Sequence, residues 1–327
     1  MRILVCGGAG YIGSHTVLEL LDRGYEVTVV DNLETGYRRA VDKRAKLLVG
    51  DLRDASFTEQ IFKEDTIEAV IDFAAYSLVG QSVAEPLKYY ENNLYGTLNL
   101  LKAMEAANIK FLVFSSTAAT YGEPKRVPIL ESDDTTPTNP YGETKLAIEK
   151  MLYWESKASG LCYAALRYFN VAGAHVSGEI GEAHNPETHL IPNVLKVALK
   201  QKEKLSIFGD DYDTEDGTCV RDYIHVTDLA DAHILALEKI MEVKENRTYN
   251  LGNGKGFSNK QILSCALKVT GEEIPYTFEE RRPGDPAILV ASSEKIIQEL
   301  GWEPKYNTLE KIIETAWNWH VNHPNGY

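Results

Sequence analysis

A tyrosine and a lysine four residues apart, Tyr141 and Lys145, are the side chains whose types and spacing first suggest acid–base chemistry. On a helix, residues at this spacing share one face. An ammonium group beside a phenol favours the phenolate and lowers the pKa of the tyrosine, which makes a base from a side chain otherwise protonated near neutrality. Because such a pair also occurs by chance on protein surfaces, its meaning depends on the elements that position it.

The chain opens with a strand–helix–strand pattern. A short apolar run precedes Gly7, Gly10 and Gly13, a helical pattern follows them, and Asp31 ends the next apolar run. Small residues at these positions let the backbone turn tightly and approach a pyrophosphate at a helix N-terminus. A carboxylate at Asp31 can accept hydrogen bonds from an adenosine ribose and repel a 2′-phosphate. The pattern predicts NAD rather than NADP, with a purely structural glycine turn as the alternative.

Strands and helices continue to alternate downstream. Further strands are expected at 46–51, 68–75, 111–117, 163–170 and 205–208, with helices at 87–107 and 141–159 and a junction loop at 173–192. The strand at 111–117 ends in Ser115, Ser116 and Thr117. Ligands of open parallel sheets bind outside the strand C-termini, so these hydroxyls are placed to contact one, although helix capping would also explain them.

The fold class is therefore α/β. We expect a Rossmann-type, doubly wound parallel sheet that binds NAD in residues 1–169. Residues 170–327 are expected to form mainly a smaller C-terminal α/β substrate-binding domain. Some segments of this second half can return to the first domain.

Composition narrows the partners. The 327 residues carry 34 Lys+Arg and 48 Asp+Glu, a net charge of −14 that argues against binding to nucleic acid or an anionic membrane surface. No apolar run approaches the roughly 20 residues of a membrane span, and no export signal is recognised. The four cysteines are far apart and match neither a zinc spacing nor a compact disulfide set, so a reduced, cytoplasmic location is expected.

Two arginines and two histidines are further candidate ligands. Arg221 and Arg282 lie in loops punctuated by Gly and Pro, and could clamp phosphates with two hydrogen bonds each, the alternative being ordinary surface or ion-paired arginines. His184 and His189 could be metal ligands, but no third partner has a convincing spacing. No metal is expected.

Taken together, these motifs resemble the extended short-chain dehydrogenase/reductase family. The resemblance rests on the glycine triplet, Asp31, Ser116-Thr117, the Tyr141/Lys145 pair and residues 221–226. More narrowly, the chain is similar over its whole length to the 4-epimerases of UDP-glucose and UDP-galactose, with close matches at residues 7–15, 167–170 and 214–218.

The resemblance implies a role for each matching residue. Tyr141 would be the acid/base, Thr117 would hydrogen-bond the sugar 4-hydroxyl, and Lys145 would hold the nicotinamide ribose and depress the Tyr141 pKa. Tightly held NAD would be lined by Gly7, Gly10, Tyr11, Ile12, Gly13, Asp31, Asn32, Asp51, Leu52, Phe73, Ala74, Ala75, Asn92, Tyr141, Lys145 and Phe169. The UDP-sugar would contact Thr117, Asn170, His189, Leu190, Leu205, Ser206, Ile207, Phe208, Arg221, Arg282, Asp285 and Leu289.

The implied reaction is reversible C4 epimerisation through a 4-keto sugar, in a homodimer formed through helices 87–107 and 141–159. Alternatives are a 4-epimerase of UDP-glucuronate or a UDP-pentose, a nucleotide-sugar dehydratase or decarboxylase, and a non-enzymatic NAD sensor. Related dehydratases carry an acidic residue after the catalytic Thr, where this chain has Ala118 and Ala119. Ser77 and His189 replace a Lys and an Asn of many 4-epimerases, and Leu289 occupies the position that gates 2-acetamido sugars, which leaves activity on them open.

Overall fold

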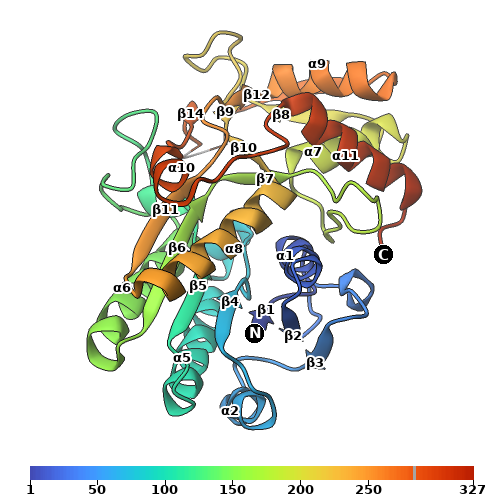
Figure 1. The fold of residues 1–327 in the computed structure, drawn as a ribbon. Coiled ribbons are helices and arrows are strands. Elements are labelled where there is room, and N and C mark those ends of the chain that lie inside the picture. Colours follow the sequence, from blue (N-terminus) through green and yellow to red (C-terminus); the bar gives the residue numbers. More distant parts are fainter. Residues whose placement is uncertain (283–284) are drawn as a thin grey trace.

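A seven-stranded, wholly parallel sheet forms the larger part of the molecule (Figure 1). The computed structural model describes residues 1–282 and 285–327, so Pro283 and Gly284 of the Arg282 loop lie outside the described residues. In spatial order, the strands are β11 (Arg247–Leu251), β6 (Cys162–Tyr168), β5 (Phe111–Ser115), β4 (Ala69–Asp72), β1 (Arg2–Cys6), β2 (Glu26–Asp31) and β3 (Lys46–Val49). The expected doubly wound fold is confirmed.

The strand order reverses at β1, which fixes where a ligand can bind. Val5 of β1 pairs with Val29 of β2 on one side and with Ile71 of β4 on the other. The connections after β1 and β4 therefore diverge to opposite sides of the sheet. They leave a crevice at the carboxyl ends of the strands, the usual ligand position in such sheets.

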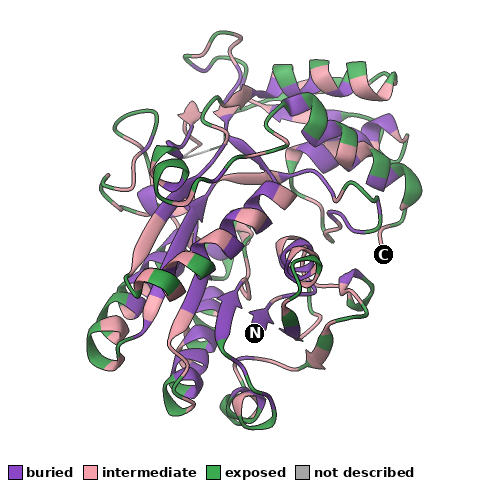
Figure 2. Ribbon diagram, in the orientation of Figure 1, coloured by how far each residue is buried: buried purple, intermediate pink, exposed green. Residues whose placement is uncertain are grey.

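Helices cover both faces of this sheet (Figure 1). On one face lie α1 (Tyr11–Asp22), α8 (Val226–Val243) and α10 (Glu294–Leu300), and on the other α2 (Ala55–Glu64), α5 (Gly96–Ala106) and α6 (Pro140–Ser159). The central strands are buried along most of their length (Figure 2). Two separate apolar cores result, one under each layer of helices.

The long helix expected at 87–107 is interrupted. It consists of α4 (Pro86–Tyr89), a π-helical turn, η2 (Tyr90–Tyr95), and α5. Within the turn, the buried Asn93 side chain accepts a hydrogen bond from Tyr76 N (2.8 Å) and donates to Tyr76 O and Thr144 Oγ1. The extra residue of a π turn directs Asn93 inward, where it ties this helix to α6 and to the loop after β4. A short helix, α3 (Val79–Ala84), precedes the segment.

Four expected strands end earlier than their sequence patterns suggested, and one of them is β6, which ends at Tyr168 and not at residue 170. Asp51, Phe73 and Thr117 all lie beyond the last residue of their strands, where the backbone has left the sheet and turned towards the crevice. The expected loop at 173–192 is also too long, because α7 (Leu190–Ala198) begins inside it.

A smaller region with its own core is built on the C-terminal edge of the sheet. It contains the strand pairs β7 (Asn170–Ala172) with β10 (Tyr223–His225) and β8 (Leu205–Phe208) with β13 (Tyr276–Glu279), the strands β9 (Val220–Arg221), β12 (Phe257–Ser258) and β14 (Ile288–Leu289), and the helices α7, α9 (Asn259–Thr270) and α11 (Leu309–Asn322). Between these elements the chain returns to the large sheet as α8 and β11. The division into two domains at residue 169 remains a prediction, and the chain passes between the two regions more than once.

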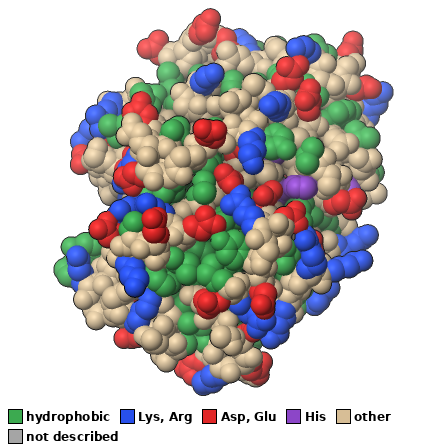
Figure 3. Space-filling view, viewed as in Figure 1, with side chains coloured by type: hydrophobic (Ala, Val, Ile, Leu, Met, Phe, Trp, Pro, Cys, Tyr) green, Lys and Arg blue, Asp and Glu red, His purple; other side chains and the backbone are tan. Residues whose placement is uncertain are grey.

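The surface carries charges of both signs. Acidic and basic side chains are interspersed over the face shown in Figure 3. Among the described residues, no helix has the length and apolar character needed to cross a lipid bilayer.

Candidate active site

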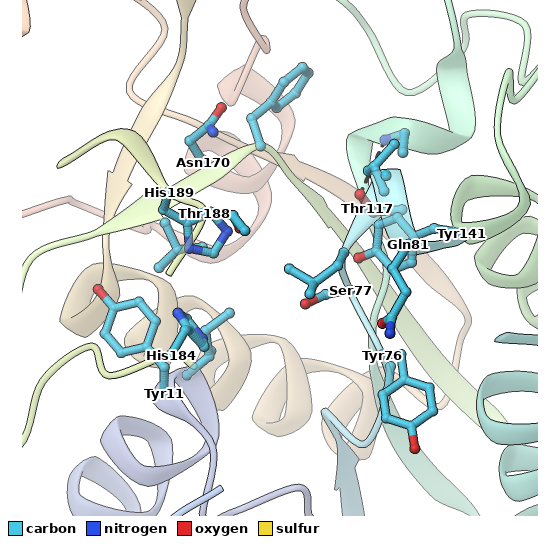
Figure 4. Close-up of a pocket in the computed structure, with 18 of the residues that line it drawn as sticks. Tyr11, Tyr76, Ser77, Gln81, Thr117, Tyr141, Asn170, His184, Thr188 and His189 are labelled. Atoms are coloured by element: carbon cyan, nitrogen blue, oxygen red, sulfur yellow. Dashed lines mark hydrogen bonds between the residues drawn. The ribbon is translucent and has the colours of Figure 1, made fainter. Parts of the chain in front are cut away.

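One large cavity, of about 1340 Å³, lies between the C-terminal edge of the sheet and the smaller region. Every residue that the family resemblance predicted to bind NAD or substrate lines it. Of the three hydroxyls expected to contact a ligand, Ser115 and Thr117 line the cavity, whereas Ser116 does not and instead donates a hydrogen bond to Glu149. Side chains face each other across this space in Figure 4, with Thr117 and Tyr141 on one wall and Asn170, His184 and His189 on the other. A cavity of this size has room for two sizeable ligands side by side, since single drug-sized sites measure about 300–1000 Å³.

The glycine turn between β1 and α1 fits a pyrophosphate. A Cβ on Gly13 would lie 2.2 Å from Gly7 O, and one on Gly7, where φ is +73°, would lie 2.8 Å from Ala74 N. Gly10 caps α1 without a side chain, and the first turn of the helix contains no acidic residue. The free backbone N–H groups and the positive end of the helix dipole are therefore open to an anion.

Carboxylates end β2 and follow β3 in the same cavity. Asp31 is buried and accepts hydrogen bonds from Ala9 N (2.9 Å) and Leu33 N (2.8 Å). Burial raises the pKa of Asp31, and these two hydrogen bonds oppose the rise. Asp51 binds Asn32 and the Arg53 guanidinium, which brings the pKa of Asp51 to about 2. Each Asp31 oxygen keeps acceptor capacity for a ribose hydroxyl, so the residues present fit the adenosine half of NAD.

Helix α6 places Tyr141 at the cavity because its N-terminus is fixed. Asn139 caps the helix by accepting a hydrogen bond from Gly142 N (2.9 Å), and Pro140 occupies the first turn. Gly142 is required there, since a Cβ would lie 2.6 Å from Ala119 O. This close approach brings the Tyr141 phenol beside the Thr117 hydroxyl (Figure 4).

The expected effect of Lys145 on the pKa of Tyr141 stays a prediction, because the groups that shift this pKa in the structure are others. Burial raises the pKa of the Tyr141 phenol, and the group that opposes this rise is the Thr117 hydroxyl. The Lys145 ammonium donates to Ser115 O (2.8 Å) and lies 4.8 Å from the Phe114 ring centroid. Burial also lowers the pKa of Lys145 to about 8, an effect that Asp72 and Glu149 oppose, so the side chain is still mostly protonated at neutral pH.

A buried polar network supports this wall of the cavity. Glu149, two turns along α6 from Gly142, accepts a hydrogen bond from Arg167 Nε of β6 at 2.9 Å and another from Ser116 Oγ. Arg167 also donates to the Tyr121 hydroxyl (2.9 Å). The network joins the helix that carries Tyr141 to the strand end that carries Thr117, so it holds the two reacting side chains in a fixed relation.

The smaller region contributes cationic side chains to the opposite side. Arg221 is buried, donates to Val220 O (2.8 Å) and forms an ion pair with Asp285. The Arg282 guanidinium stacks on the Phe208 ring, 4.1 Å from its centroid. Both arginines line the cavity, and their role as phosphate ligands stays a prediction. Arg221 is also ion-paired, as the alternative interpretation expected.

The comparisons with known proteins agree with this geometry. A family model described as the NAD dependent epimerase/dehydratase family matches residues 3–252. The chain belongs to this family. A UDP-glucose 4-epimerase of Halalkalibacterium halodurans is 59% identical over all of this chain and 98% of its own length.

Two solved structures extend the likeness to the epimerase fold. A crystal structure of a UDP-glucose 4-epimerase superposes with a TM-score of 0.98 at 57% identity and covers 100% of this chain and 99% of its own. The Bifidobacterium longum enzyme in complex with NAD+ and UDP has a TM-score of 0.94 at 42% identity over 100% of both chains. The family recognised from the sequence motifs is confirmed.

This member of the epimerase/dehydratase family has cavity residues that the sequence did not reveal. They include Tyr76 and Gln81 between β4 and α4, and Glu187 and Thr188 before α7. Neither segment has a helical or strand period. For Glu187, however, a signal was present, because Glu182, His184, Glu187 and His189 alternate within eight residues.

Proposed function

We propose that this chain interconverts UDP-glucose and UDP-galactose by reversible inversion at C4, with tightly bound NAD. The observation that carries the proposal is the single cavity that joins the glycine turn, the Thr117/Tyr141 pair and two arginines. Its first part fits NAD, as argued above, and the family is NAD dependent. When bound, NAD accepts a hydride from C4 of the sugar and returns it.

The reacting proton is moved by Tyr141. Its phenolate removes the proton of the sugar 4-hydroxyl, and the phenol returns a proton after the ring of the 4-keto sugar has turned its other face to the site. Thr117 hydrogen-bonds the same sugar oxygen and stabilises the phenolate, as its effect on the Tyr141 pKa indicates. Lys145, held by Ser115 O, is placed to orient the nicotinamide ribose.

The nucleotide anchors the substrate while the sugar remains free to turn. Arg221 and Arg282 bind the diphosphate, with Asp285 fixing the orientation of Arg221 and Phe208 that of Arg282. Tight binding of the hexose itself would hold one face towards the cofactor and oppose inversion. The two arginines lie in the smaller region, whereas Tyr141 lies in the larger, so anchoring and chemistry are separated.

The dehydratase alternative lacks its acid. Ala118 and Ala119 follow Thr117 as the first residues of a short 3₁₀ helix, η3 (Ala118–Tyr121), and both line the cavity. Their methyl groups supply no proton for the loss of water from the sugar. A 4-epimerase acting on UDP-glucuronate or a UDP-pentose is the second candidate, distinguished by its products.

The test is a product assay on the purified chain without added reductant. We expect UDP-galactose to be converted to UDP-glucose and Tyr141→Phe to reduce turnover by roughly 10²–10⁴-fold, with the NAD content unchanged. Full turnover by the Tyr141→Phe variant would show that Tyr141 is not the acid/base of the reaction. Conversion of UDP-glucuronate but not UDP-galactose would favour the second candidate.

We also propose a homodimer through the helices expected from the sequence, 87–107 (α4, η2 and α5) and 141–159 (α6), together with the neighbouring α3. Large apolar side chains on these helices are exposed, among them Val83 (63%), Leu87 (81%) and Trp154 (70%). We expect sedimentation velocity to give twice the mass of the chain, and a Leu87→Asp/Trp154→Asp variant to sediment as a monomer. A wild-type monomer would contradict the proposal. The cytoplasmic location likewise remains a proposal, supported by four free cysteines.

A further inference from the structure

A second constellation of side chains lies at the edge of the cavity, in the segment before α7. Glu182, His184, Glu187 and His189 each direct one oxygen or nitrogen to a common point, and these four atoms lie within 4.8 Å of one another. The two carboxylates are almost completely buried, with 4% and 3% of their side chains exposed. The two imidazoles are more open, at 28% and 44%.

The spacing of these atoms suits a tetrahedral ion. Zinc binds imidazole nitrogen and carboxylate oxygen at roughly 2.0–2.2 Å, which separates neighbouring ligands by roughly 3.3–3.6 Å. His184 Nδ1 lies 3.2 Å from Glu182 Oε1 and 3.6 Å from Glu187 Oε2. The other oxygen of Glu187, Oε1, lies 3.7 Å from His189 Nδ1. One contact, 2.6 Å between His189 Nδ1 and Glu182 Oε1, must lengthen.

Two atoms of the cluster are buried and lack a hydrogen-bond partner. His184 Nδ1 and Glu187 Oε2 face each other without a hydrogen-bond partner. An unsatisfied buried polar atom costs about 1–3 kcal/mol, and more when it is charged. Glu187 Oε1, by contrast, accepts a hydrogen bond from His189 N (2.9 Å), a contact that orients the carboxylate as outer partners of metal ligands do.

We propose that Glu182, His184, Glu187 and His189 form a binding site for a divalent first-row metal ion of the zinc type. Two imidazoles and two carboxylates form the mixed nitrogen and oxygen donor set that such ions accept. The ion reaches the site from the cavity, which His184, Glu187 and His189 line. Two carboxylates balance its charge. The proposal replaces the expectation of no metal, which considered only the two histidines.

The ion has a positioning role. His189 caps α7, and Leu190, the first residue of that helix, lines the cavity among the predicted substrate contacts. Cross-linking residues 182–189 through a metal would fix the approach to α7. No step of the epimerisation uses the ion, so the proposal stands or falls independently of the proposed function.

The competing state is a metal-free cluster of ion pairs. Burial alone would lower the pKa of His184, but the neighbouring carboxylates of Glu182 and Glu187 raise it to about 10. Protonated histidines would then neutralise the two carboxylates without an ion. A metal ion must displace these protons in order to bind. Two measurements therefore distinguish the metal site from the ion-paired cluster: the stoichiometry of Zn²⁺ binding and the coordination geometry of bound Co²⁺.

The experiment uses the full chain, freed of metal with EDTA and dialysed. We expect calorimetry with ZnCl₂ to show one ion per chain, and Co²⁺ to give the intense visible bands of tetrahedral coordination. Glu187→Gln should weaken Zn²⁺ binding by roughly 100-fold, since loss of an outer partner alone costs 10–100-fold. Glu179→Gln, an exposed residue of the same segment, is the matched control and should bind as the wild type does.

A second substitution covers the case in which Glu187→Gln does not fold. His189→Gln changes a more exposed side chain and should weaken Zn²⁺ binding to a similar degree. Equal affinity of the wild type and the variant that folds would overturn the proposal, as would a Co²⁺ spectrum of the octahedral aqueous type. Absence of stoichiometric Zn²⁺ binding would leave the ion-paired cluster as the correct description.

Discussion

Replacing Thr117 by Val tests whether this hydroxyl, rather than the Lys145 ammonium, favours the Tyr141 phenolate. The hydroxyl is suitably disposed, because Thr117 Oγ1 accepts a hydrogen bond from Ala119 N (3.1 Å), which leaves its O–H free to donate. Valine keeps the shape of the side chain and removes the donor. The Tyr141 pKa should therefore rise further, because burial, which already raises it, is no longer opposed.

The expected loss follows from the strength of one hydrogen bond to a charged group. Such bonds contribute about 1.5–3 kcal/mol. At 1.36 kcal/mol for each factor of ten, turnover at a fixed pH below the Tyr141 pKa should fall by roughly 10- to 150-fold. Since the phenolate is the active form, the rising limb of the pH–rate profile should move to higher pH, and the deficit should shrink as the pH increases.

The assay is epimerisation of UDP-galactose over a range of pH, with NAD content and circular dichroism as checks on folding. Thr117→Ser keeps the hydroxyl and should retain the wild-type limb. A Thr117→Val profile that is lower at every pH by one constant factor would refute the reasoning, because the hydroxyl would then act on the substrate without affecting the Tyr141 pKa.

Two further substitutions test the support and the selectivity of the cavity. Glu149→Gln leaves the buried Arg167 guanidinium without its counter-charge and should lower the free energy of unfolding by about 3–5 kcal/mol in urea titrations; a loss no larger than that of the exposed Glu143→Gln on the same helix would contradict this. Leu289→Tyr should reduce the rate on UDP-N-acetylgalactosamine more than the rate on UDP-galactose, because the larger ring narrows the pocket; an unchanged ratio of the two rates would show that Leu289 is not the gate.

The part of the fold that was predictable from sequence is the part set by short-range patterns. The strands Arg2–Cys6 and Glu26–Asp31 lie where the apolar runs before Gly7 and up to Asp31 predicted them, because apolar runs bounded by glycine or charge specify buried parallel strands. The helix that carries Tyr141 begins one residue before the prediction, at Pro140. Residues of the expected NAD and sugar sites meet in one cavity, although the role of each remains a prediction.

What the sequence did not reveal depends on contacts between distant residues. The π turn at Asn93 depends on hydrogen bonds to Tyr76 and Thr144, far away in sequence. The Lys145 ammonium donates a hydrogen bond to Ser115 O. The four-residue spacing from Tyr141 does not predict this partner, because Ser115 is 30 residues away in the sequence. Glu182 and Glu187 lie in a segment without periodicity, so only the folded loop shows that they face the histidines.

The return of α8 and β11 to the large sheet restricts how far the cleft can open. The chain passes between the two regions several times, and β11 completes the sheet edge beside β6 while α8 covers α1. A fragment of residues 1–169 would therefore expose the edge of β6 and the apolar side of α1 instead of folding independently. The same crossings act as several parallel tethers across the cleft, so wide opening would strain all of them together.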